Sequence, residues 1–437
     1  MCKNIIRSIL NELFWAGFRT AALGPTRSEC VTPGGLLRCA MAGAPSWTQY
    51  LGGVRDEETR RTVDGWAGTT LFENISNTAF SMFHGLTDTG PMRPAFVHEF
   101  EALLKKHDVH ADVHWYPLGH DILARVMQRG KLLKTTKQTK PRLPSHVVVV
   151  TAEYRANRQH WLSVTGIDDY PSTARLEGTR VGDALQIRAS KNVRSFRIHF
   201  EDFGSERPRS IQIDGQPVIA LKNKSAGFVD VYNQKEAWST TPPEHRSNGS
   251  MKRPKMSGPI TDAYYDRMVH VYGTLDAPQS EILQAAAKRG ARGWPLWAWD
   301  IEQPIIADTE LSDDEAKRSN IVLYGSPKSN AVIRKLQPSL PIAITDTGVV
   351  VGKRTFEGKD YGVRFIFPNP QFPERYVIVQ GSSDPNTVVA GNRLPEFLGD
   401  YVVFDAKKLG KNQPRTFSSR NKGFMGYFCD DWTLCEP

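Results

Sequence analysis

Two short segments of the sequence each place a potential catalytic side chain just beyond a predicted strand. Asp88 lies in the loop after the apolar run at 80–85, and His120 follows the strand-like run at 111–117. Functional groups of a parallel sheet gather beyond the carboxyl ends of its strands, so we expect these two side chains to be neighbours. A carboxylate that holds an imidazole in one tautomer lets the histidine act first as a general base and then as a general acid. The arrangement therefore predicts two members of a catalytic triad.

An α/β domain over residues 1–135 is expected to position this pair. Strands that alternate with helices pair in parallel through right-handed crossovers, which puts Asp88 and His120 at one edge of the sheet. The expected elements are an amphipathic helix near the N-terminus, strands at 19–24, 36–44, 80–85 and 111–117, and a helix at 94–108.

Two further modules are expected after this domain. Short alternating runs with tight turns such as Asp214-Gly215 predict an antiparallel, sandwich-like β module over 145–238. A polar, Pro-containing stretch at 239–258 is typical of a linker. Strand and helix patterns then return, which predicts a second α/β domain over 259–437. The expected fold class of the whole chain is therefore α/β with a central antiparallel β module.

Composition and charge exclude several classes of protein. The chain has 437 residues, too many for one ordinary core, and its 40% hydrophobic and 24% charged content is that of a globular protein of two or three domains. No run approaches the ~18 apolar residues of a membrane span, and the N-terminal segment does not have the pattern of a signal peptide. The net charge is +9, and its densest cluster at 129–142 contains no aromatic residue. We therefore expect a solvated linker there and no nucleic-acid partner.

Neither a metal ion nor a cofactor is expected. The five cysteines form no C-x-x-C pair and no His-Cys metal spacing. His107, His110 and His114 suggest zinc, but His107 falls at a helix end and no fourth ligand is signalled, so a solvent-exposed face is the preferred interpretation. The strand-to-helix turn at 324–330 lacks the phosphate-loop pattern, and we expect Ser326 or Ser329 to cap the helix there.

Other side chains keep two interpretations. Trp297 and Trp299 share one strand face and could stack on a sugar, although burial against a helix is the commoner fate of such aromatics. Cys429 and Cys435 could form a disulfide, but their spacing alone does not decide this. Asp88 could cap the helix near Pro94; its context favours the triad position instead.

The segment from Phe83 to Asp121 resembles the acid-to-histidine part of the prolyl-oligopeptidase-like serine hydrolases. Both have a His-Gly loop carrying an acid, then a helix rich in Glu, Leu and Lys, then a strand followed by a histidine. The runs "ANRQHWLSV", "GPITDAYYDR", "NIVLYGSPKSN" and "FPNPQFPERYVIVQG" resemble pieces of the long C-terminal extension of some bacterial members, so the similarity reaches from about residue 19 onward. The resemblance implies a peptidase or esterase with an α/β-hydrolase sheet, Asp88 as the acid, His120 as the base, and a periplasmic or secreted location.

The nucleophile does not follow the pattern of that group. A strand is expected to lead into G-x-S-x-G-G, whose sharp turn exposes the serine. Here the strand ends at Gly24, Thr26 occupies the nucleophile position, and Ser28 and Glu29 replace the two glycines. The alternative registration at 30–35 also offers a threonine, with a proline directly after it that supplies no backbone donor.

Two functions are therefore expected as alternatives. Only 23 residues precede Gly24, so the strands before the nucleophile are expected to be missing, as in a truncated or decayed hydrolase. The first function is a serine hydrolase with a peptide or ester substrate, impaired or inactive in this chain. The second is a non-catalytic remnant that uses the β module and the C-terminal α/β domain for binding.

Overall fold

The chain folds into two compact units of mixed α/β class, which agrees with the expected class at this level. The first unit comprises Met1–Gly53 and Val63–Arg246, and the second comprises Val54–Thr62 and Ser247–Pro437. The predicted boundaries near residues 135 and 145 both fall inside the first unit. The computed structural model describes residues 31–32, 35–41, 57–65, 67–77, 79–119, 121–122, 143–221, 227–234, 237–243, 251–293, 303–395, 398–410 and 423–435.

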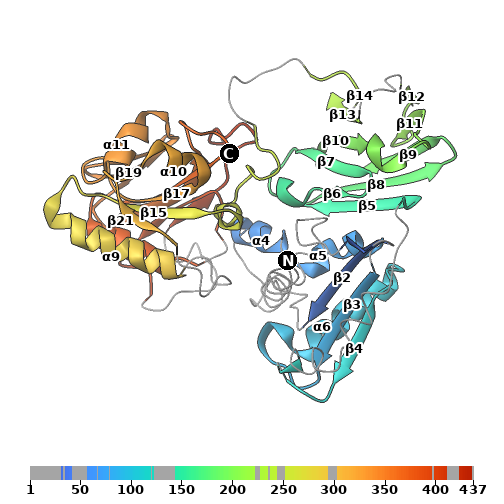
Figure 1. The fold of residues 1–437 in the computed structure, drawn as a ribbon, viewed down its shortest axis with the longest axis horizontal. Coiled ribbons are helices and arrows are strands. Elements are labelled where there is room, and N and C mark those ends of the chain that lie inside the picture. Colours follow the sequence, from blue (N-terminus) through green and yellow to red (C-terminus); the bar gives the residue numbers. More distant parts are fainter. Residues whose placement is uncertain are drawn as a thin grey trace. The chain divides into compact units, whose positions relative to one another are not determined.

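A four-stranded sheet opens the first unit, in the order β1-β2-β3-β4 (Figure 1). β2, β3 and β4 are parallel neighbours in chain order, and β1 pairs with β2 as a short antiparallel hairpin. The strand predicted at 19–24 and the linker predicted at 129–142 lie outside the described residues. The elements are β1 (Val31–Thr32), β2 (Gly35–Met41), α5 (Gly68–Leu71), η1 (Phe72–Ile75), β3 (Ala79–Gly85), η2 (Gly90–Met92), α6 (Pro94–Lys106) and β4 (Asp112–Tyr116). Helix α4 (Glu57–Asp64) precedes α5, and its residues as far as Thr62 belong to the second unit.

Helix α6 supplies the apolar face that covers these strands. Val97, Phe100 and Leu104 recur at helical spacing and are buried against Phe80 and Met82 of β3. Pro94 at the first helical position is compatible with the start of a helix, because its missing N–H would have no partner there. The predicted helix and the last two predicted strands are therefore confirmed, with ends shifted by one or two residues.

Two five-stranded sheets follow and share one core (Figure 1). Their orders are β14-β13-β10-β7-β6 and β12-β11-β9-β8-β5. Pairing is antiparallel except between β9 and β11, because β10, the strand between them in sequence, belongs to the other sheet. The strands are β5 (His146–Thr151), β6 (Arg158–Gln159), β7 (Leu162–Ile167), β8 (Ala174–Val181), β9 (Ala184–Ala189), β10 (Val193–His199), β11 (Ser210–Ile213), β12 (Ile219–Ala220), β13 (Phe228–Gln234) and β14 (Ala237–Ser239), with 3-10 helices η3 (Tyr154–Ala156) and η4 (Phe200–Phe203).

Trp161 is the largest buried side chain of this core. Its indole N–H donates to the carbonyl oxygen of Pro144 at 2.9 Å, and its ring lies where a Cβ on Gly178 would stand, 2.4 Å away. Glycine at position 178 is therefore required by the indole and not by a turn. The predicted tight turn at Asp214-Gly215 is confirmed, since both residues have positive φ values after β11.

One asparagine joins the parallel sheet to the β layers. β5 is an edge strand, and the side chain of Asn74 pairs with it: Nδ2 donates to the carbonyl oxygen of Val150 and Oδ1 accepts from its N–H, both at 2.7 Å. Nearby, Leu71 packs against Val148, Val150 and Ala156. The amide group thus completes the hydrogen bonding of a buried strand edge.

Asn74→Ala should lower the free energy of unfolding of the first unit by about 2–4 kcal/mol, because it leaves a buried N–H and a buried C=O without partners. Urea unfolding followed by circular dichroism measures this. Asn77→Ala is the matched control, since Asn77 makes one exposed bond to the carbonyl oxygen of His146 and its loss should cost roughly 0.5 kcal/mol. Equal effects of the two substitutions would contradict the role assigned to Asn74.

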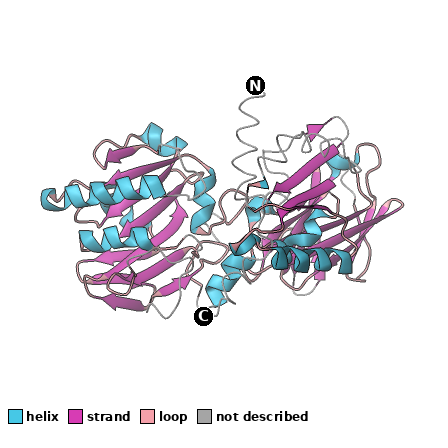
Figure 2. Cartoon of the chain, turned by 90° about the horizontal axis from the view of Figure 1, so that it is seen from below, coloured by secondary structure: helices cyan, strands magenta, loops and turns pink. Residues whose placement is uncertain are grey.

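The second unit is built on a seven-stranded sheet in the order β16-β15-β17-β22-β21-β23-β24. The first four strands are parallel and the last three antiparallel, and Figure 2 shows helices lying against the strands of this unit. The elements are η5 (Ile260–Tyr265), β15 (Met268–Tyr272), α9 (Ala277–Gly293), β16 (Ile305–Ala307), α10 (Asp313–Arg318), β17 (Asn320–Gly325), α11 (Ala331–Leu336), η6 (Gln337–Ser339), β18 (Ile342–Thr345), β19 (Gly348–Val351), β20 (Arg354–Glu357), β21 (Tyr361–Pro368), β22 (Tyr376–Gly381), α12 (Pro385–Ala390), η7 (Gly391–Arg393), β23 (Tyr401–Asp405) and β24 (Phe424–Gly426).

The central strands of this sheet are buried along their whole length. β17, β22 and β23 contain no exposed residue, which explains their nearly continuous apolar sequences. Strands β18, β19 and β20 form a separate three-stranded antiparallel sheet. Cys429 and Cys435 form a disulfide close to the C-terminus, which decides the alternative that their spacing left open.

The predicted linker at 239–258 is wrong for its last residues. Lys252, Met256 and Ser257 are at most 3% exposed, and Met256 belongs to the core of the second unit. The linker was predicted because polar residues are usually exposed to solvent. Here Lys252 and Ser257 are polar groups whose partners lie inside the fold.

His270 on β15 should make the second unit sensitive to acid. Burial lowers its pKa to about 4, and its ring nitrogens lie 2.8 Å from the Tyr324 hydroxyl and 2.6 Å from Gln303 Oε1. The unfolded chain binds a proton near pH 6.5 and the folded one only near pH 4, so stability should fall as pH drops across that window, by roughly 3 kcal/mol at its lower end.

Urea unfolding at pH 7, 6, 5 and 4 tests the role of His270, with His270→Gln beside the unchanged chain. The substituted chain should lose much less stability across the series. His110→Gln, which replaces an exposed histidine in the first unit, is run beside it as the control for the substitution itself. A wild-type stability that does not change between pH 7 and pH 4 would exclude this role.

Candidate functional site

Asp88 lies on the turn that leaves the carboxyl end of β3. Its N–H donates to the carbonyl oxygen of Gly85 at 3.3 Å, and its Oδ1 accepts from the N–H of Thr89 at 2.8 Å. The residue is only 7% exposed. The carboxylate is thus held by its own turn just beyond the strand, where the sequence placed it.

The turn after β3 is fixed to the turn after β4. Leu86 N–H donates to the carbonyl oxygen of Tyr116 at 2.8 Å, and Thr87 N–H donates to that of Leu118 at 3.0 Å. A Cβ on Gly85 would stand 2.3 Å from the Leu118 oxygen and 2.5 Å from the Gly119 oxygen. Only glycine at position 85 allows the two backbones to approach this closely.

The contact reaches the residues that directly precede the two predicted catalytic positions. A Cβ on Gly119 would lie 3.5 Å from Thr87 Oγ1, so Thr87 and Gly119 are neighbours. Thr87 precedes Asp88 and Gly119 precedes His120 in the sequence. His120 and Thr26 themselves lie outside the described residues. Of the three predicted catalytic residues, the structure therefore places Asp88 directly.

Asp88 does not cap the helix that follows it. The N-cap position of α6 is Arg93, whose side chain makes no capping hydrogen bond, and Asp88 lies five residues before it. The capping alternative for Asp88 is therefore wrong. Reasoning from the sequence missed the steric role of Gly85, although a His-Gly pair directly after an apolar strand was a visible signal.

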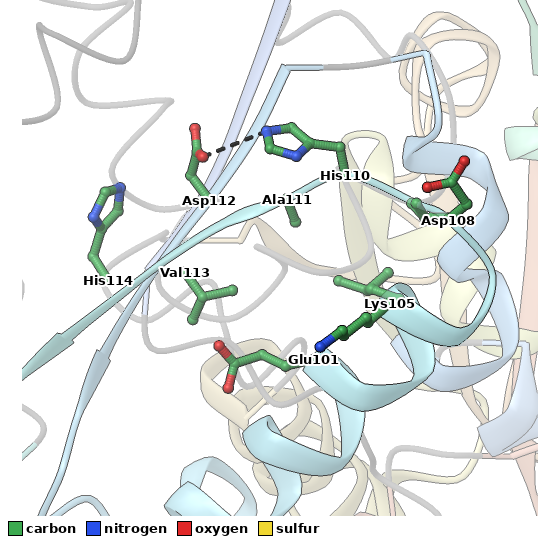
Figure 3. Close-up of a pocket in the computed structure, with 10 residues that line it drawn as sticks. Glu101, Lys105, Asp108, His110, Ala111, Asp112, Val113 and His114 are labelled. Carbon is green, nitrogen blue, oxygen red and sulfur yellow. Dashed lines mark ion pairs between the residues drawn. The ribbon is translucent and has the colours of Figure 1, made fainter.

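An open groove of about 540 Å³ lies at the opposite end of this sheet (Figure 3). Its lining comes from the second half of α6, the turn after it and β4: Glu101, Leu104, Lys105, Asp108, Val109, His110, Ala111, Asp112, Val113 and His114. Its lining on β4 runs from Asp112 to His114 and stops before the carboxyl end of the strand, whereas Asp88 follows the carboxyl end of the neighbouring strand β3. The groove is therefore not part of the candidate site.

The histidines of the groove do not converge. His110 Nε2 lies 3.5 Å from Asp112 Oδ1, while the ring of His114 stacks on Phe83 with 4.7 Å between centroids. Figure 3 shows Asp112 directed toward His110 and His114 standing farther along β4. Within the described ranges, no group of three His, Cys, Asp or Glu side chains is arranged to hold a metal ion.

The second unit has a place where ligands of open α/β sheets commonly bind, between the carboxyl ends of β15 and β17. Its own side chains occupy this place. Asp308 Oδ1 accepts from the N–H and hydroxyl of Thr274, and Oδ2 accepts from the N–H of Ala331 at 2.6 Å. The carbonyl oxygen of Ser329 also accepts from Leu275 N–H. These bonds join the three loops that follow β15, β16 and β17.

The helix cap predicted in this second region is wrong. Asn330 caps α11, because its Oδ1 accepts from the N–H groups of Val332 and Ile333. Ser329 instead accepts from Ser326 N–H within the preceding turn, and neither serine caps the helix. Serine and asparagine both favour cap positions, and the helix begins one residue later than the sequence indicated. Trp297 and Trp299 lie outside the described residues.

Comparisons with known proteins add no relative: the sequence matches no protein-family model and no curated protein. Among the helices that the structure describes, none has the length and apolar character needed to cross a membrane.

Gly85→Ala should disturb the candidate site, because the new methyl group would overlap two carbonyl oxygens of the β4 turn. We expect it to lower the free energy of unfolding of the first unit by about 1–3 kcal/mol, as for other overpacking substitutions. Gly119→Ala is the matched control: its methyl group would meet only Thr87 at ordinary contact distance and should change stability by roughly 0.5 kcal/mol or less. Urea unfolding of both variants measures the difference, and a harmless Gly85→Ala would show that the backbones need not be in contact.

Proposed function

We propose that this chain is a serine-hydrolase-type protein of the prolyl-oligopeptidase-like group, a peptidase or esterase whose activity is impaired at the nucleophile. In this proposal β2, β3 and β4 are consecutive strands of a partial α/β-hydrolase sheet. Asp88 is the acid, His120 the base, and Thr26 stands in the place of the serine. The observation that carries the proposal is the contact between Thr87 and Gly119, the residues that precede the acid and the histidine.

The order of the strands supports this assignment. β3 and β4 are adjacent and parallel, joined by one helix, so residues beyond their carboxyl ends share one edge of the sheet. The carboxylate of Asp88 is held by the N–H of Thr89 and is largely shielded from water. A shielded, oriented carboxylate can fix the tautomer of a neighbouring imidazole and stabilise its protonated form.

The proposed reaction is acyl transfer to an oxygen nucleophile. His120 would accept the hydroxyl proton of Thr26 as the oxygen attacks an ester or amide carbonyl, and would return that proton to the leaving group. A water molecule, activated in the same way, would release the acyl group. Threonine carries an additional methyl group, and Ser28 and Glu29 replace the glycines that keep this turn open, so a low rate is expected.

Labelling with a fluorophosphonate probe tests the proposed site in the purified chain. We expect a slow adduct on Thr26, located by mass spectrometry, whose formation is abolished in His120→Ala and slowed about 10²-fold or more in Asp88→Asn. Asp112→Asn, at the far end of the same strands, is the matched control and should label like the unchanged chain. An adduct that forms equally well in His120→Ala would exclude the proposed base.

The pairing of acid and base can be tested separately from hydrolysis. In the unchanged chain, proton NMR should show a strongly deshielded imidazole N–H assigned to His120, and this resonance should be lost in Asp88→Asn. If it is present and no adduct forms, the two residues are paired but the nucleophile does not function. If it is absent from a folded chain that also forms no adduct, the site is not of the hydrolase type, and binding becomes the function to examine.

A further inference from the structure

A lysine and an aspartate meet in the interior of the second unit, and neither belongs to the proposed catalytic site. Lys252 Nζ lies 2.5 Å from Asp400 Oδ2, and both side chains are completely excluded from solvent. The two residues are 148 positions apart in the sequence. The N–H of Phe428 donates to Asp400 Oδ2 at 2.9 Å.

The environment of this pair is aromatic and excludes water. Lys252 Nζ lies 4.9 Å from the centre of the Trp432 ring, and Phe428 and Tyr376 pack against the same indole. The backbone at Gly258 is close as well, since a Cβ there would stand 2.1 Å from Asp400 Oδ1. Among the described residues, none donates a hydrogen bond to this Oδ1.

Burial favours the neutral forms of both groups. Removal from water lowers the pKa of Lys252 and raises the pKa of Asp400, although each partly offsets the shift of the other. The negative field of Asp262, which is itself fully buried, raises the pKa of both. A neutral amine in contact with a neutral carboxylic acid is the pair of reactants from which an amide forms.

We propose that Lys252 and Asp400 condense to an intramolecular isopeptide bond. The lone pair of Lys252 Nζ forms a bond to Asp400 Cγ, and the bond from Cγ to Oδ1 breaks. One proton from the amine leaves with the acid's hydroxyl as water, so an amine and an acid become an amide and one water molecule. No oxidant, cofactor or activated intermediate is required.

Each group in the pocket has a part in this reaction. The N–H of Phe428 donates to Oδ2, which stabilises negative charge on that oxygen when the amine attacks. Oδ1 has no donor to retain it and is therefore the oxygen that departs. Because both side chains are excluded from solvent, water is not available at the site for the reverse hydrolysis.

The bond would secure a segment that already carries one covalent cross-link. Lys252 N–H donates to the carbonyl oxygen of Asp430 at 2.6 Å, and Asp430 lies within the loop closed by the Cys429–Cys435 disulfide. Asp400 directly precedes β23 of the central sheet. An amide between Lys252 and Asp400 would therefore tie the start of the second unit to its central sheet, beside the disulfide loop.

Intact-mass spectrometry of the purified full chain tests the proposal, after reduction and alkylation remove the contribution of the disulfide. We expect a mass lower than the sequence mass by one water molecule once the folded chain has been kept at neutral pH until its mass is constant. Trypsin should then release a branched peptide that joins residues 247–255 to residues 394–407. Full sequence mass, with residues 394–407 recovered as a free peptide and the chain cleaved after Lys252, would overturn the proposal.

Two variants localise the missing water. Lys252→Arg replaces the amine with a guanidinium group, which does not condense with a carboxylic acid, so this variant should have its full calculated mass. Lys407→Arg is the matched control: Lys407 also contacts an aspartate, Asp360, but in solvent, and this variant should still lack one water. A water loss that persists in Lys252→Arg would place the modification elsewhere and reject the assignment. The wild-type mass decides the question even if Lys252→Arg does not fold.

Discussion

The close approach of two backbones beyond β3 and β4 is the constraint on which the candidate site depends. Gly85 has no side chain, so the carbonyl oxygens of Leu118 and Gly119 can occupy the space that a Cβ would need. This contact requires β3 and β4 to be adjacent and parallel, which in turn requires α6 to cross between them and bury its apolar face. The position of Asp88, on the turn after β3, therefore depends on the packing of α6 and on the absence of a side chain at Gly85.

The two units use buried polar groups in contrasting ways. In the first, Asn74 completes a strand edge, while Asp88 is shielded at an edge of the sheet where a substrate could arrive. In the second, Asp308 closes the crevice between β15 and β17, and Lys252 and Asp400 meet out of reach of any solute. The buried polar groups of the second unit named here therefore bond to other parts of the same unit.

Local patterns predicted the parts of the structure that local forces decide. Apolar runs predicted the strands β3 and β4, and the helical spacing of Val97, Phe100 and Leu104 predicted α6. The pair Asp214-Gly215 predicted a tight turn. Features decided by distant contacts were missed. Lys252 was assigned to a linker because its partner Asp400 is 148 residues away in the sequence. The parallel pairing of β9 with β11 was not predicted, because it depends on β10 lying in the other sheet. For the site, the acid was predictable from its place after a strand, whereas the steric demand on Gly85 depends on a turn more than 30 residues later.

The hydrogen bonds of the Asn74 side chain determine which fragments of this protein expose an unpaired strand edge. β5 contains four consecutive valines and lies at the edge of its sheet, where unpaired N–H and C=O groups invite another strand. A fragment that began after residue 122 would lack Asn74, so the N–H and C=O groups of Val150 would lose their partners. The exposed edge strand would be β5, whose valines have a high β propensity. Such a fragment would tend to self-associate through its valines. The 3-10 helix η1, which carries Asn74, thus protects the first unit against aggregation through this strand edge.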